Sequence, residues 1–235
     1  MLGWDELRAC LERGDFPADK LRVTRDRHAL PAILFTDEGK VSGAKLSRLL
    51  ESGVSLIAEP LQPHVPALRV LADEIAARIP EKIKIGAIAT TGAGGAFAPH
   101  YDPEDLIILQ LQGSKRWTIH APSVVHPVRG LAPPPPRGAA AFDDVLRPGD
   151  FLFVPAGHWH ACENDADLSL HLGIFFRPPT AWHALSALAA RLLAEEVFRR
   201  PLTRFANAAE RAEYEAMVRE RLREAVAEMP LTDDP

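Results

Sequence analysis

The chain has 235 residues, a formal net charge of −5, 47% apolar residues and 25% charged residues. This balance is typical of a globular protein that buries a sizeable core and needs no disulfide bonds or structural metal ions to stabilise it. It argues against a duplex nucleic-acid partner, because no strongly basic face stands out, and no apolar run approaches the length of a membrane helix. Two widely separated cysteines and an N-terminus without an apolar signal segment favour a reducing, cytoplasmic location.

The N-terminal part of the chain mixes helix and strand signals. Apolar residues at helical spacing predict helices over 4–13, 43–52 and 65–79. The short apolar stretches AILF (32–35) and SLIAEP (55–60) indicate strands between these helices. We therefore expect an α/β lead-in to the rest of the fold.

Strand signals dominate between about residues 82 and 178. They fall on KIKIGAIATT, LIILQLQ, KRWTIH, DFLFVPA and LSLHLGIFFR, which begin at residues 82, 106, 115, 150 and 168. The turn Gly113-Ser114 between the second and third of these stretches indicates a hairpin. The segment LAPPPPRG (131–138) is expected to be an exposed loop, because proline cannot donate to a sheet. Several short strands separated by turns favour a β-barrel or sandwich core.

The C-terminal part of the chain is predicted to be helical over 181–199 and 205–229. The second helix carries an apolar stripe among dense Arg and Glu residues (Phe205, Tyr214, Met217, Val218, Leu222, Ala225 and Met229). This stripe either packs on the β core or forms a dimer interface, and we favour a homodimer. The expected organisation is one domain over 1–180 and a helical dimerisation region over 181–235.

One segment, PGDFLFVPAGHWHACEN (148–164), contains two histidines in an apolar context. It resembles the second motif of the cupin superfamily, G-x5-P-x-G-x2-H-x3-N, at every fixed position (Gly149, Pro155, Gly157, His160 and Asn164). The pattern favours His160 as a metal ligand. His158 is the competing candidate. We expect it to contact the metal ligands without binding the metal, or to lie at the pocket rim.

The upstream segment GGAFAPHYD (94–102) supplies the partners of His160. Residues i and i+2 of a strand share a face, so His100 and Asp102 should point the same way. Together the three side chains provide two imidazoles and one carboxylate. This is the facial triad of non-haem Fe(II) oxygenases, which leaves coordination positions open. The alternative is a barrel that keeps the pattern but has lost the metal.

Lys115 follows His100 by 15 residues (115 − 100 = 15) and is flanked by apolar strand residues. A lysine at this place can point into the barrel and pair with a buried anion. The surrounding segment, HYDPEDLIILQLQGSKRW, resembles JmjC-type, cupin-fold 2-oxoglutarate oxygenases. Within that group it is most similar to the ribosomal oxygenases, which hydroxylate protein side chains, over roughly residues 54–178.

The resemblance implies roles for individual residues. His100, Asp102 and His160 would be the catalytic iron ligands, and Lys115 would hold the distal carboxylate of the cosubstrate 2-oxoglutarate. The keto acid would bind the iron through its 1-carboxylate and 2-oxo group, which leaves the sixth position for O2. His171 stands where the family often has a polar residue that lines the pocket, so it is a further cosubstrate-site candidate.

Two departures from the family pattern bear on the substrate. Gly86 and Ile88 stand where the family commonly has an asparagine and a tyrosine, which predicts a more apolar pocket and a different substrate. Ribosomal oxygenases also continue into a winged-helix domain. The 58 residues after Arg177 (235 − 177 = 58) leave room for dimerisation helices but not for that domain.

We therefore predict a double-stranded β-helix core, of the cupin, jelly-roll or JmjC-like kind, in an Fe(II)- and 2-oxoglutarate-dependent oxygenase. Its expected reaction is hydroxylation of a C–H bond in a protein or peptide side chain. The alternatives are a hydroxylase of a small-molecule natural product and a metal-binding cupin without oxygenase activity. The sequence does not distinguish hydroxylation from demethylation, because both reactions begin with the same hydrogen abstraction.

Overall fold

The computed structural model of the chain describes residues 2–13, 16–79, 81–128, 131, 134–201 and 206–230. The chain divides into two units, Met1–Arg177 and Pro178–Pro235. Among the described residues, no helix is both long enough and apolar enough to cross a membrane.

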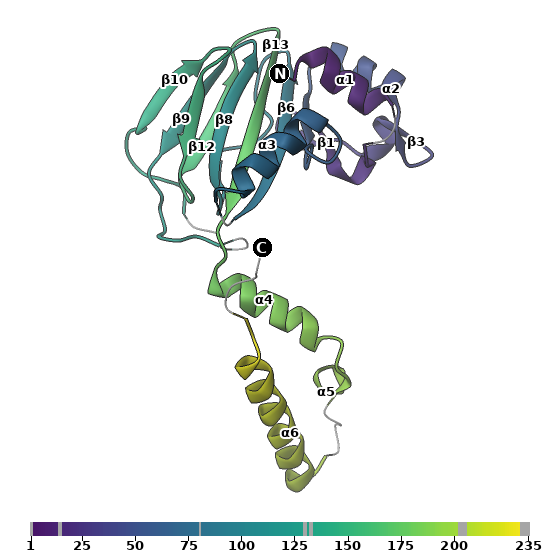
Figure 1. Ribbon diagram of the computed structural model, residues 1–235, viewed down its shortest axis with the longest axis vertical. Coiled ribbons are helices and arrows are strands. Elements are labelled where there is room, and N and C mark those ends of the chain that lie inside the picture. Colours follow the sequence, from purple (N-terminus) through teal and green to yellow (C-terminus); the bar gives the residue numbers. More distant parts are fainter. Residues whose placement is uncertain are drawn as a thin grey trace. The chain divides into compact units, whose positions relative to one another are not determined.

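Two antiparallel sheets form the first unit (Figure 1). The seven-stranded sheet contains, in spatial order, β11 (Phe151–Val154), β8 (Asp105–Gln112), β13 (Leu168–Arg177), β6 (Lys82–Thr91), β5 (Ser55–Ala58), β1 (Leu21–Arg25) and β2 (His28–Ala29). The four-stranded sheet contains β10 (Phe142–Leu146), β9 (Lys115–His120), β12 (Trp159–Asn164) and β7 (His100–Tyr101). A small separate sheet pairs β3 (Thr36–Asp37) with β4 (Lys40–Val41). The predicted mainly-β class with a double-stranded β-helix core is confirmed.

The seven-stranded sheet has two buried faces, which explains why its central strands are almost wholly buried. Along β13, Leu170, Leu172 and Ile174 join the large apolar core. The alternating residues His171 and Gly173 face the other way, into a pocket, because successive strand side chains point to opposite faces. A second core connects the two sheets through residues of β8, β9, β10 and β11 (Leu106, Ile108, Trp117, Ile119, Leu146 and Val154).

The N-terminal lead-in covers the outer face of the seven-stranded sheet. Its α-helices are α1 (Trp4–Glu12), α2 (Gly43–Glu51) and α3 (Pro66–Ala76), and η1 (Ala18–Lys20) is a single 3-10 turn. Leu7, Leu46 and Leu68, one from each α-helix, belong to the same core as β13 and β6. The three predicted helices and the strand at β5 are therefore confirmed.

The predicted strand over 32–35 is wrong, because this stretch forms the 3-10 turn η2 (Ala32–Leu34). Pro31 precedes the turn with a φ of −59°, and its carbonyl oxygen accepts a hydrogen bond from the Leu34 N–H at 3.0 Å. Proline fixes φ near this value and so favours a tight turn. The side chain of Ile33 is 73% exposed, so the apolar run here is not part of a buried strand.

The predicted hairpin around Gly113 is also wrong, although both of its strands exist. β8 pairs with β11 and β13, whereas β9 pairs with β10 and β12 in the other sheet. Gly113 has a φ of +61°, and a Cβ there would lie 2.0 Å from the Leu168 carbonyl oxygen. Only glycine fits such a crossing between sheets. The crossing brings Lys115 to the start of β9, where its side chain points into the barrel.

The second unit consists of α4 (Ala181–Leu192), α5 (Glu196–Arg199) and α6 (Ala208–Ala227). The predicted helix over 181–199 is thus interrupted, and Phe205 of the predicted stripe lies outside the described residues. A small core joins the helices (Leu188, Leu192, Phe198, Ala225 and Met229). Other apolar side chains of this unit stay substantially exposed (Trp182, Leu185, Leu193, Met217, Leu222 and Val226). The described part of the proline-rich segment, residues 131 and 134–138, contains no helix or strand.

Candidate functional site

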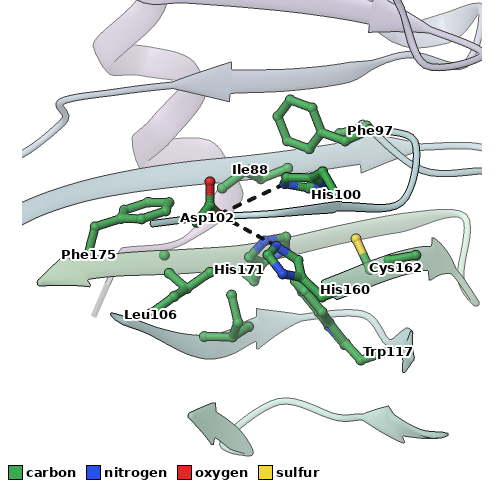
Figure 2. Close-up of a pocket in the computed structure, with 14 residues that line it drawn as sticks. Ile88, Phe97, His100, Asp102, Leu106, Trp117, His160, Cys162, His171 and Phe175 are labelled. Atoms are coloured by element: carbon green, nitrogen blue, oxygen red, sulfur yellow. Dashed lines mark ion pairs between the residues drawn. The ribbon is translucent and has the colours of Figure 1, made fainter. Parts of the chain in front are cut away.

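Three side chains with metal-binding atoms converge at one end of the four-stranded sheet. His100 Nε2 lies 3.9 Å from Asp102 Oδ2, and His160 Nε2 lies 3.5 Å from the same oxygen. One donor atom from each of the three residues lies within 4.8 Å of the others. Figure 2 shows both imidazoles turned toward the Asp102 carboxylate. The structure therefore brings the three predicted ligands together.

The hydrogen bonds of the two imidazoles fix their tautomers. His100 Nδ1 lies 2.9 Å from the Ala98 carbonyl oxygen, and His160 Nδ1 lies 3.1 Å from the His158 carbonyl oxygen. A carbonyl oxygen can only accept, so each Nδ1 carries the proton and donates it. Each Nε2 is then left with a free lone pair that faces Asp102. Proteins orient histidine ligands by such a hydrogen bond from the ring nitrogen that does not bind the metal.

His160 is the most buried of the three residues, with its side chain 4% exposed. Burial lowers its pKa, and the nearby His100 lowers it further, while Asp102 and the His158 carbonyl act in the opposite direction. A lowered pKa keeps the imidazole neutral at pH 7, which is the form that binds a metal.

Backbone contacts connect the His160 motif to the first ligand segment. β12 pairs with β7 so that His160 lies opposite His100. The Gly157 N–H donates to the Asp102 carbonyl oxygen at 2.8 Å. The Asn164 N–H donates to the Gly94 carbonyl oxygen at 2.8 Å, and its side-chain amide donates to Gly92. The fixed glycine and asparagine of the motif thus hold the upstream ligands in place.

His158 lies outside the ligand cluster. Its Nδ1 lies 3.2 Å from the Pro155 carbonyl oxygen, within its own turn. Among the described residues, the group that could hold a metal contains His100, Asp102 and His160 only. The contribution of His158 to this cluster is its backbone carbonyl, which orients the His160 ring.

Lys115 is completely buried, and its Nζ donates to Thr90 Oγ1 at 2.8 Å. Burial lowers the pKa of the ammonium group, and the nearby Cys162 opposes this effect. The neighbouring Arg116 points outward and pairs with Asp143 at 2.8 Å, as strand alternation predicts. None of the interactions described for Lys115 involves a carboxylate. A buried ammonium without an anionic partner is costly, so this position favours an anionic ligand.

Other buried polar atoms gather beside Lys115 without a hydrogen-bond partner among the described residues. They are Trp117 Nε1, His171 Nδ1 and Ser169 Oγ. The rings of Trp117 and His171 meet edge to face, with their centroids 5.3 Å apart. Burial, and then the charge of Lys115, lower the pKa of His171 well below its usual range, so this imidazole is neutral. Orphaned buried donors of this kind are expected where a polar ligand binds.

The pocket between these groups and the triad is largely apolar. Its apolar wall comes from both sheets and from the turn before His100 (Ile88, Ala96, Phe97, Leu106, Ile108, Trp117, Ala161, Cys162, Gly173 and Phe175). His171 and the three triad residues supply the polar lining (Figure 2). Ile88, which was predicted to make the pocket apolar, lies in this wall. Gly86 lies next to Glu59, the residue that follows β5.

Several residues of this site were missed by the sequence analysis. Thr90 and Phe175 follow Ile88 and His171 at strand spacing, so period-two alternation could have identified them. Phe97 gave no such signal, because it lies in the irregular segment before β7. Its ring packs 5.2 Å from that of His100, centroid to centroid.

Comparison with known proteins places the site in a family context. The family model for the JmjC domain matches residues 67–184. Ribosomal oxygenase 1 of Homo sapiens is 36% identical over 120 residues, which cover 46% of this chain and 19% of that protein. The bifunctional lysine-specific demethylase and histidyl-hydroxylase NO66 of Drosophila persimilis is 40% identical over 79 residues, or 32% of this chain and 12% of the relative. The chain thus spans about a fifth or less of these relatives' lengths.

Solved structures share the fold across nearly the whole chain. The ribosomal oxygenase YcfD of Escherichia coli, solved in complex with cobalt and 2-oxoglutarate, has a TM-score of 0.54 and 18% sequence identity. The similarity covers 94% of this chain and 59% of that one. At this identity the similarity establishes a common fold, which agrees with the two-sheet architecture described above.

Proposed function

The chain belongs to the JmjC domain family, and from that membership and its His-Asp-His cluster we propose an Fe(II)- and 2-oxoglutarate-dependent oxygenase that hydroxylates a C–H bond. The observation that carries the proposal is the convergence of two Nε2 lone pairs and one carboxylate at the end of a largely apolar pocket. Two imidazoles and one carboxylate are the donor set of non-haem Fe(II) oxygenases.

The residues fit a metal ion of this kind. Bonds of about 2.1 Å require neighbouring donor atoms roughly 3 Å apart. The observed separations of 3.5 and 3.9 Å from Asp102 Oδ2 need only small side-chain movements to reach that spacing. His100, Asp102 and His160 would hold the metal, and the pocket side would stay open for other ligands. Bound iron would supply O2 activation coupled to decarboxylation of the keto acid to succinate and CO2.

The residues also fit 2-oxoglutarate. The buried ammonium of Lys115 can pair with the distal carboxylate, with Thr90 Oγ1 as a neighbouring hydroxyl. The unpartnered donors at Trp117 and Ser169 lie in the same buried region and can satisfy further oxygen atoms. We assign the cosubstrate to this region, with Lys115 as its main anchor and His171, which is neutral, as a lining residue. The apolar walls limit the access of water to the reacting atoms.

We propose a protein or peptide side chain as the substrate. The support is the sequence similarity to proteins named ribosomal oxygenase and histidyl-hydroxylase. The apolar wall at Ile88 and Phe175 also suits a small apolar molecule, which keeps a natural-product hydroxylase as a second candidate.

Anaerobic reconstitution tests the oxygenase proposal directly. Addition of Fe(II) and 2-oxoglutarate should produce a weak visible charge-transfer band, and O2 should then yield succinate without added substrate. His100→Ala and Asp102→Ala should lose both signals, while Glu163→Gln, at an exposed ion pair with Arg27, should keep them. A wild-type protein that binds iron but gives neither signal would contradict the proposal.

A metal-binding cupin without oxygenase activity is the other candidate. The hydrogen bond from Lys115 to Thr90 favours it, because that bond partly satisfies the lysine without any cosubstrate. The two candidates differ in 2-oxoglutarate binding, which calorimetry with Mn(II) in place of Fe(II) can measure. Binding that is unchanged by Lys115→Ala, or that is absent in the wild type, would favour the non-oxygenase cupin.

We also propose that the region over 181–235 forms a homodimer. Apolar side chains on α4 and α6 stay exposed, among them Trp182 at 51% and Val226 at 52%. Covering such surface with a second copy removes apolar area from water and stabilises the assembly.

A further inference from the structure

Three charged side chains form a linked group at the edge of the pocket. Glu59 Oε1 lies 3.3 Å from Arg22 Nη2, and Glu59 Oε2 lies 3.3 Å from Lys84 Nζ. Each carboxylate oxygen therefore has its own cation, and Glu59 connects β1 with β6. The side chains of Glu59 and Lys84 are 23% and 30% exposed, whereas that of Arg22 is 52% exposed, so the Lys84 contact is the less screened of the two.

Both cations also lie against aromatic rings that line the pocket. The Arg22 guanidinium carbon is 5.2 Å from the centroid of the Phe97 ring, and Lys84 Nζ is 4.1 Å from that of Phe175. Both distances fall within the range of cation–π attraction. In Figure 2 the two rings lie on either side of Asp102 and Ile88, in the wall next to the triad. One carboxylate is thus connected to both aromatic walls.

A glycine on β6 makes room for this arrangement. Lys84, Gly86 and Ile88 share one face of the strand, and Ile88 lines the pocket. A Cβ added at Gly86 would lie 3.0 Å from Glu59 Cβ and 3.3 Å from Glu59 Oε2. A side chain at position 86 would therefore crowd Glu59, which would have to move by a few tenths of an ångström.

We infer that Glu59 is a positioning residue for the substrate: through Arg22 and Lys84 it couples Phe97 and Phe175, so that the two aromatic walls move together. The substrate part of this inference rests on the proposed oxygenase function, while the coupling is a property of the chain alone. Coupled walls give the pocket a fixed width. They select a substrate group by its size, because neither ring can adjust without disturbing the other.

Fluorine NMR of the metal-free protein, labelled with 4-fluorophenylalanine, tests the coupling. Loss of single resonances in Phe97→Leu and Phe175→Leu variants assigns the two signals. Arg22→Met should shift the signal of Phe175 as well as that of Phe97, and Lys84→Met should shift both signals too. In a Glu59→Gln background, each of these substitutions should shift only the ring that its own side chain contacts.

A matched control and a second variant keep the test decisive. Glu163→Gln removes a carboxylate that pairs with Arg27 at 3.1 Å, and it should leave both signals unchanged. Gly86→Ala keeps every charge but crowds Glu59, so it should reduce the cross-effects without abolishing them. Cross-effects that are absent in the wild-type background, or that persist at full size in the Glu59→Gln background, would overturn the inference. Because the protein carries no iron in this experiment, failure of the oxygenase proposal would appear separately, as absence of succinate.

Discussion

Replacement of Lys115 by methionine separates ligand binding from stability, because the two should change in opposite directions. Methionine keeps the unbranched apolar stem and removes the ammonium group. Burial lowers the Lys115 pKa, so the folded chain releases this proton at a lower pH than the unfolded chain does. The folded state therefore carries a penalty at every pH below its own pKa, and the penalty disappears only above the unfolded-state value of about 10.4.

The ligand-free variant should therefore be at least as stable as the wild type at neutral pH. The substitution removes one hydrogen bond to Thr90, but Thr90 Oγ1 keeps its contact with Ser55 Oγ at 3.0 Å and is not left unpaired. The affinity for 2-oxoglutarate should fall steeply. Removal of one partner from a buried ion pair costs roughly 3–5 kcal/mol. Because each tenfold change in Kd corresponds to about 1.4 kcal/mol, the affinity should fall by more than about 100-fold.

Thermal or chemical unfolding with Mn(II), with and without 2-oxoglutarate, measures both effects in one experiment. A ligand at 100 times its Kd stabilises the wild type by about 2.7 kcal/mol, and this gain should vanish in Lys115→Met. The matched control is Arg116→Met, which removes the exposed neighbouring cation and its surface pair with Asp143. Such pairs contribute about 0–1 kcal/mol, so the control should keep the ligand-induced gain. Unchanged affinity in Lys115→Met, or a ligand-free variant several kcal/mol less stable than wild type, would refute the reasoning.

Three further outcomes are expected. His160→Ala should abolish Mn(II) binding measured by calorimetry, whereas His158→Ala should retain it; the reverse ranking would show that the ligand assignment is wrong. Gly157→Ala should lower the free energy of unfolding by roughly 1–3 kcal/mol in denaturant titrations, because its φ of +81° is a left-handed conformation. An unchanged midpoint would contradict that. Leu222→Glu should convert a dimer into a monomer in light scattering, with Glu220→Gln as the neutral control, and a monomeric wild type would rule out the dimer.

Local sequence patterns predicted the strands of the β core well, because alternation and turn residues act over a few positions. β6, β8, β9 and β13 all lie where the alternation indicated. The hairpin at Gly113 failed because turn chemistry cannot tell which sheet the next strand will join. That choice depends on the close approach of Leu168, which is distant in sequence. Strand pairing is a long-range property, so a local signal leaves it open.

The same distinction separates the site residues that could be predicted from those that could not. His100 and Asp102 are two positions apart, and His160 lies in a segment that resembles the second cupin motif, so strand spacing and that resemblance together proposed the set that the structure brings together. Glu59 had no such signal. Its position beside the pocket depends on the pairing of β5 with β6 and on the missing side chain at Gly86.

The shortness of β7 explains why the second motif is needed to shape the first. β7 contains only His100 and Tyr101, so its two residue pairs with β12 cannot fix the position of Asp102 by themselves. The remaining constraint comes from the Gly157 N–H, which donates to the Asp102 carbonyl oxygen at 2.8 Å. The turn at Gly157 therefore orients a ligand on another strand as well as the following His160. A Cβ at Gly157 would lie 2.7 Å from Pro127 Cγ, so the turn that carries both this N–H and His160 would have to shift. Gly157→Ala should therefore weaken Mn(II) binding in calorimetry as well as lower the free energy of unfolding.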